Sequence, residues 1–118
     1  MAVANDLADQ FDAGGRLADH LEGFQPRPGQ RRLAERIAEC LESRHDLVAE
    51  AATGTGKTLA YLLPVLARGG RAIISTGTLN LQDQLFSRDL PLALKVSGAE
   101  RKVALLKGRA NYLCPQRM

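Results

Sequence analysis

Residues 50–58, Glu-Ala-Ala-Thr-Gly-Thr-Gly-Lys-Thr, constrain the fold of this chain more than any other stretch. The apolar run of residues 47–49 comes just before them, and leucines recur at helical spacing after them. A glycine-rich loop between a strand and a helix is typical of a nucleotide phosphate cradle, because backbone N–H groups and the helix N-terminus point at the phosphate. Gly54 and Gly56 have no side chain, so the loop can curl around that phosphate.

Each residue of this loop has an expected part in binding ATP and Mg²⁺. The backbone that would cradle the phosphates belongs to Ala52, Thr53, Gly54, Thr55 and Gly56. Lys57 would reach the β- and γ-phosphates, and the Thr58 hydroxyl would take a Mg²⁺ coordination position. Ala51 departs from the general pattern, which has a glycine there. The alternative, a plain turn with a solvated lysine, is disfavoured by the regular patterns on both sides.

The rest of the chain alternates between expected strands and helices. We expect strands at residues 47–49, 71–75 and 102–106, and helices at residues 30–43, 57–68 and 79–90. Strands with consecutive apolar residues that alternate with helices predict an α/β fold with a parallel sheet. Pro64 should kink or shorten the second helix, and Pro91 should end the third.

Smaller features complete this pattern. Residues 1–22 predict two short amphipathic pieces separated by Gly14 and Gly15, and residues 24–29 predict an extended connector. Cys40 belongs to the apolar stripe of its helix and is expected to be a core residue. Charges of both signs between residues 31 and 39 predict neighbouring ion pairs on that helix.

The bulk properties place few limits on function. The chain has 118 residues, which suits one small domain or a part of a larger one. It has no apolar run near the ~20 residues of a membrane span, and its acidic N-terminus lacks a signal core, so we expect a cytoplasmic protein. Its net charge is +3, with acidic residues before residue 23 and basic residues after residue 94. This asymmetry suits a nucleic-acid partner and a solvated face equally well.

Three segments together resemble the N-terminal part of the DinG/YoaA helicases: residues 50–58, 74–85 and 105–115. These are bacterial relatives of the XPD-type superfamily 2 DNA helicases that carry an iron–sulfur cluster, and the YoaA type is the closer match. The phosphate loop alone is generic, whereas its combination with Ser-Thr-Gly-Thr-Leu and Lys-Gly-Arg-x-Asn-Tyr-x-Cys is specific. The resemblance implies a P-loop NTPase (RecA-like) motor domain and an ATP-dependent DNA helicase of DNA repair or replication, with 5′-to-3′ polarity.

The resemblance also assigns binding roles. Phe24, Arg27 and Gln30 match the region ahead of the phosphate loop that holds the adenine, and an amide offers the base both a donor and an acceptor. Without the resemblance, Gln30 is an ordinary polar residue of a first helical turn. Contacts with the backbone of single-stranded DNA are implied for Ser75, Thr76, Gly77 and Thr78, and for Lys107 and Arg109. The alternative for residues 76–78 is an ordinary helix-capping turn.

Cys114 matches the first of the cysteines that hold a [4Fe–4S] cluster in this family. A cluster needs several thiolates, and Cys40 does not match a ligand, so the other ligands are expected beyond Met118. The implied division is an N-terminal extension (1–23), the N-terminal part of the first motor domain (24–106) and the start of the iron–sulfur domain (107–118).

These residues contain no Asp-Glu-Ala-His box. We therefore expect an N-terminal fragment that is inactive alone, within a protein whose partners are single-stranded or forked DNA and replication or repair proteins. Two other functions stay open on the sequence. One is a P-loop kinase or NTPase that acts on a small molecule. The other is a truncated module that binds nucleotide without turnover.

Overall fold

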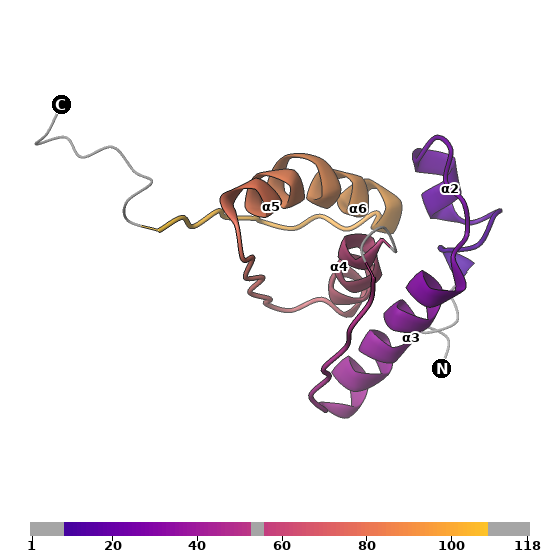
Figure 1. The fold of residues 1–118 in the computed structure, drawn as a ribbon, viewed down its shortest axis with the longest axis horizontal. Helices are drawn as coiled ribbons and strands as arrows, with labels where there is room; N and C mark the ends of the chain where they lie inside the picture. Colours follow the sequence, from indigo (N-terminus) through magenta and orange to yellow (C-terminus); the bar gives the residue numbers. More distant parts are fainter. Residues whose placement is uncertain (1–8, 53–55, 109–118) are drawn as a thin grey trace, which may run out of the picture.

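Helix α4 (Lys57–Arg68) lies at the centre of the structure, a computed structural model that describes residues 9–52 and 56–108 (Figure 1). Apolar residues occupy nearly all of its positions, and a helix of that kind is stable only when neighbours cover it on several sides. Its buried side chains are those of Leu59, Ala60, Leu62, Leu63, Pro64 and Leu66. The helix therefore forms the core around which the other elements pack, as its sequence pattern predicts.

The other helical elements of the described residues pack on α4 or on one another. They are α2 (Arg16–His20), α3 (Pro28–Ser43), α5 (Leu79–Gln84), the π-helical turn η1 (Leu85–Asp89) and α6 (Leu90–Ser97). Helix α3 packs along α4, and α6 packs against both α4 and α2. Within the described ranges, no helix is long and apolar enough to cross a bilayer.

Helix α3 confirms the expected helix at residues 30–43 and extends it by one half-turn. It begins at Pro28, so Pro28 and Gly29 belong to the helix and not to the expected connector. Proline suits a first helical position, because its fixed φ is helical and its missing N–H would have no partner there. The predicted ion pairs form between Arg31 and Glu35 and between Arg36 and Glu39. Cys40 is 7% exposed, which confirms it as a core residue.

The expectation for Pro91 is wrong, and of the two outcomes expected at Pro64 the early end does not occur. Helix α4 does not end early at Pro64, since it runs on to Arg68. Pro91 does not end a helix either, because α6 begins at Leu90 and runs to Ser97. The widened turn η1 lies just ahead, where the Leu90 N–H donates to the Leu85 carbonyl five residues back. Such a turn lets the helical run continue past a proline that cannot donate a hydrogen bond.

The predicted parallel sheet is not confirmed. In residues 9–52 and 56–108 there is no β-strand, and the segments expected as strands are irregular. Val48 and Ile73 are each 99% exposed and Leu106 is 83% exposed. A parallel strand is stable when neighbours pair with it and cover both of its faces. In the described residues, these three segments neither pair with one another nor cover one another's faces.

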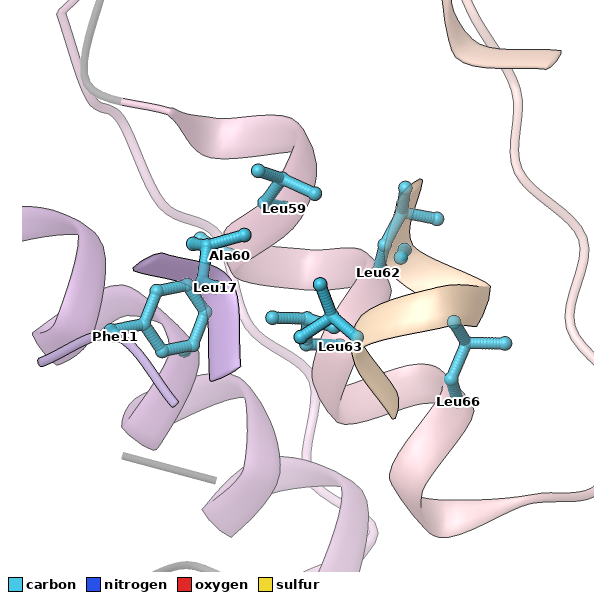
Figure 2. Packing of buried hydrophobic residues seen from close by; sticks show 10 residues of the cluster. Phe11, Leu17, Leu59, Ala60, Leu62, Leu63 and Leu66 are labelled. Atoms are coloured by element: carbon cyan, nitrogen blue, oxygen red, sulfur yellow. The ribbon is translucent and has the colours of Figure 1, made fainter. Parts of the chain in front are cut away.

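Residues 11–17 are part of the same core. Phe11 and Leu17 are at most 1% exposed and lie beside α4 (Figure 2). Arg31 of α3 binds the Asp12 carboxylate at 2.8 Å, and the Arg16 guanidinium donates to the Val96 carbonyl at 3.4 Å. Helix α2 confirms the second of the two short amphipathic pieces. The first falls mostly on residues 1–8, outside the described residues.

Candidate nucleotide-binding site

The phosphate loop meets α4 at Gly56. This residue caps the helix in the left-handed conformation, with φ 76°, and its carbonyl accepts the Ala60 N–H of the first turn at 3.2 Å. Lys57 and Thr58 are the first two helical residues; Lys57 is exposed and Thr58 is half-buried. The lysine and the hydroxyl therefore stand at the helix N-terminus, where a phosphate binds most favourably.

The other loop residues are only partly described. Ala52 is exposed, and Ala51 before it is half-buried. The expected phosphate contacts of Thr53, Gly54 and Thr55 lie outside the described residues.

Gln30 joins α3 to the end of the phosphate loop. Its side chain is 4% exposed, and its Nε2 donates to the Gly56 carbonyl at 3.1 Å. A Cβ placed on Gly56 would come within 2.2 Å of that same Nε2. Position 56 therefore favours glycine because of its positive φ, and a Cβ there would also push the Gln30 amide aside. The sequence alone suggested neither the Gln30 contact nor its geometry.

The second polar atom of Gln30 has a different environment. Its Oε1 is buried and has no hydrogen-bond partner among the described residues. A buried acceptor without a partner costs on the order of 1–3 kcal/mol, so a bound donor would be favourable there. This suits the predicted adenine contact without testing it.

The two residues predicted beside Gln30 lie differently. Arg27 is exposed and precedes the first residue of α3, three positions before Gln30. Phe24 packs against the hydrophobic core. Its ring is therefore used for packing, while the Arg27 side chain stays accessible.

Two clefts border this region. One, of about 530 Å³, is lined by α3, by residues 45–47 with Ala49, and by Lys57 and Tyr61 of α4. The other, of about 670 Å³, lies between α3 and the loop entry, where Ala51 and Ala52 line it. Both clefts thus lie next to residues with predicted roles in nucleotide binding.

Tyr61 is a site residue that the sequence analysis missed. It lies one turn after Thr58 on α4. Partial burial raises the pKa of the Tyr61 phenol above its ordinary value, while the neighbouring Thr58 side chain acts in the opposite direction. The phenol is therefore neutral at physiological pH. The i,i+3 spacing of the two residues was the signal that could have revealed it.

The predicted DNA-contacting loop precedes α5. Thr78 caps this helix, since its Oγ1 accepts the Leu81 N–H at 3.2 Å, and the Thr76 hydroxyl donates to the Thr78 carbonyl at 3.4 Å. The capping-turn interpretation is therefore confirmed for the Thr78 hydroxyl. Ser75 and Gly77 are exposed. A DNA contact of this loop stays a prediction.

Lys107 lies against the same helix. Its Nζ is 3.2 Å from the Asp83 carboxylate, and the neighbouring Gln82 donates from Nε2 to the Leu106 carbonyl at 2.9 Å. The structure thus brings Lys107 and the loop at residues 75–78 to one helix, α5. The sequence analysis missed Asp83, because these partners are 24 residues apart and no local spacing connects them.

The predicted cluster ligand, Cys114, and the predicted DNA contact Arg109 lie outside the described residues. Cys40 is buried in α3. In the part of the chain that the structure describes, no group of three or more His, Cys, Asp or Glu residues could hold a metal ion.

Comparison with protein families matches residues 27–111 to the DEAD/DEAH box helicases. This match covers more than half of the chain, so the chain belongs to the DEAD/DEAH box helicase family. Membership implies the P-loop NTPase fold.

Curated relatives include the ATP-dependent DNA helicase YoaA of Haemophilus influenzae, 49% identical over 118 residues, which cover 100% of this chain and 18% of the relative. YoaA of Escherichia coli K12 is 50% identical over 112 residues, or 95% of this chain and 18% of the relative. The ATP-dependent helicase DinG of Mycobacterium tuberculosis is 46% identical over 100 residues, or 78% of this chain and 15% of the relative. The predicted resemblance to YoaA and DinG is therefore confirmed.

The chain spans less than a fifth of the length of these relatives. No solved structure gave a significant match.

Proposed function

We propose that this chain forms the ATP-binding part of an ATP-dependent DNA helicase of the DinG/YoaA type. The observation that carries this proposal is the junction between Gln30 and Gly56. A left-handed glycine, whose missing Cβ leaves room for a buried amide, stands directly before the Lys-Thr pair at the start of α4. A plain turn between two elements needs no second element to approach it so closely.

The proposed roles follow from the positions of these groups. Lys57 binds the β- and γ-phosphates, and Thr58 holds a Mg²⁺ ion. The backbone of residues 52–56 surrounds the phosphates, while Arg27 and Gln30 bind the adenine. When bound, Mg²⁺ neutralises charge on the phosphate oxygens. Tyr61, one turn further along α4, borders the Thr58 hydroxyl.

The proposed DNA contacts are Ser75, Thr76, Gly77, Thr78, Lys107 and Arg109. The exposure of Ser75 and Gly77 supports this, because backbone N–H groups there can donate to phosphates. The relatives are named DNA helicases, which supports single-stranded or forked DNA as the substrate. The 5′-to-3′ polarity, a part in repair or replication together with its protein partners, and a cytoplasmic location rest on the resemblance.

The proposed fold of the full-length protein includes a parallel sheet. The three segments expected as strands contain Val48, Ile73 and Leu106. The exposure of these side chains supports the sheet, because large apolar side chains of parallel strands are normally buried in a complete domain. Strand pairing with other parts of the protein would bury them. We keep the division into residues 1–23, 24–106 and 107–118 as part of this proposal.

A [4Fe–4S] cluster would take Cys114 as one ligand. The chain has two cysteines, and Cys40 is buried in α3, so this sequence supplies at most one thiolate of the set. The residues present therefore do not form a cluster site by themselves. No step of the proposed function depends on it.

Unwinding of a labelled duplex tests the proposed function. The full-length protein should separate a duplex with a 5′ single-stranded tail only when ATP and Mg²⁺ are present. It should act more weakly on a duplex with a 3′ tail. The Lys57→Ala variant should not unwind either substrate, because the phosphates lose their lysine. Unwinding that persists in Lys57→Ala would refute the assignment of the phosphate site.

A further inference from the structure

Two neighbouring side chains of α5 hold residues 106 and 107. Gln82 donates to the Leu106 carbonyl at 2.9 Å, and the Asp83 carboxylate lies 3.2 Å from the Lys107 ammonium. The segment that follows α6 runs back alongside α6 and α5 (Figure 1). These two contacts join parts of the chain that are 24 residues apart.

In the described residues, polar contacts hold this segment at α5 while its apolar side chains stay exposed. The Leu106 side chain is 83% exposed and that of Val103 is 42% exposed, so neither is covered by α5. The Lys107 side chain is 28% exposed, whereas that of its partner Asp83 is 59% exposed. The lysine therefore lies along the helix surface, and its ammonium is held at an accessible carboxylate.

The Gln82–Leu106 hydrogen bond and the Asp83–Lys107 ion pair differ in how easily another partner can replace them. The Gln82 bond fixes the backbone at Leu106, while the Asp83 bond fixes only the end of a flexible side chain. An exposed ion pair is worth roughly 0–1 kcal/mol, so Lys107 can leave Asp83 at small cost. A DNA phosphate is also an anion, and it would compete with this carboxylate for the same ammonium.

We propose that the Asp83 carboxylate competes with DNA for the Lys107 ammonium. When DNA is absent, Lys107 pairs with Asp83. When single-stranded DNA lies on residues 75–78, Lys107 binds a backbone phosphate instead. Gln82 keeps the backbone of residue 106 anchored while the Lys107 ammonium exchanges one anion for the other. This inference rests on the proposed DNA contacts of Lys107 and the loop before α5. It goes further, because it assigns Asp83 and Gln82 opposite effects on DNA affinity.

Binding of labelled oligo(dT) to the full-length protein at fixed salt tests this exchange. Asp83→Asn keeps the size of the side chain and removes its charge, so it should tighten binding about two- to fivefold. Gln82→Leu should weaken binding, because Lys107 then lacks its anchored backbone. Glu100→Gln is the matched control for charge, since it removes one exposed negative charge from the same segment and should change binding less.

A double-mutant cycle shows whether the effect passes through Lys107. Lys107→Gln alone should weaken binding, and Asp83→Asn should then have no further effect in that background. Tightening that persists without Lys107, or weaker binding in Asp83→Asn, would overturn the proposal. Equal affinities of Asp83→Asn and the parent protein would overturn it as well, while leaving the proposed function intact. A parent protein that does not bind oligo(dT) would refute the proposed function together with this inference.

Discussion

Gly56 shows how the phosphate loop and Gln30 of α3 constrain each other. Its φ of 76° is costly for a residue with a side chain, and its absent Cβ leaves the space that Gln30 fills. From the sequence, this glycine was expected to let the loop curl around a phosphate. The approach of Gln30 could not be predicted, because it depends on how α3 packs on α4.

Gly56→Ala should therefore cost stability and binding together. We expect a loss of roughly 1–3 kcal/mol in the free energy of unfolding, because alanine is strained at positive φ. The displaced Gln30 should also weaken ATP binding. Urea unfolding and binding of a fluorescent ATP analogue measure the two effects, with Gly29→Ala as the control, since a Cβ at Gly29 meets nothing within 4 Å. Unchanged ATP affinity in Gly56→Ala would contradict the role given to this junction.

At Gly77, unlike at Gly56, the fold does not depend on the absence of a side chain. A Cβ on this residue would meet nothing within 4 Å, and its φ is not positive, so the fold does not require glycine there. If a DNA phosphate approaches the backbone at this point, a methyl group would obstruct it. Gly77→Ala should leave the unfolding midpoint unchanged and should weaken binding of oligo(dT) severalfold. Normal DNA affinity in this variant would argue against a backbone contact at residue 77.

The elements divide into those that the sequence predicts well and those that it does not. Helices α3 and α4 were predicted to within about two residues, because apolar spacing and glycine loops are local signals. The continuation past Pro91 was missed, since the π-helical turn that permits it has no plain sequence signature. The strand segments have the expected composition, but their pairing depends on residues far away in sequence.

Hydrogen exchange can test the strand assignments directly. In the full-length protein, we expect slow exchange of the backbone amides at residues 72–75 and 103–106, because ladder hydrogen bonds would protect them. Residues 1–118 alone should exchange these amides rapidly, as their exposed apolar side chains suggest. Amides of α4 in the full-length protein serve as the protected reference. Fast exchange of both segments in the full-length protein would show that the predicted sheet is wrong.

The whole molecule connects two candidate sites through one helical core. The Lys-Thr pair begins α4, while the loop at residues 75–78 and Lys107 meet at α5. Helix α4 packs against η1 and α6, which continue the helical run of α5. A contiguous set of packed elements therefore joins the proposed phosphate site to the proposed DNA surface. We therefore expect DNA at the loop and Lys107 to change ATP turnover at the phosphate site.

ATP hydrolysis by the full-length protein, measured with and without single-stranded DNA, tests that claim most directly. We predict that DNA raises the turnover rate severalfold and that Lys57→Ala abolishes turnover in both conditions. Lys95→Ala is the control, because it removes an exposed lysine at the end of α6. Turnover that requires Lys57 but ignores DNA would keep the phosphate site and contradict the helicase assignment. Turnover that survives Lys57→Ala would contradict the phosphate site itself.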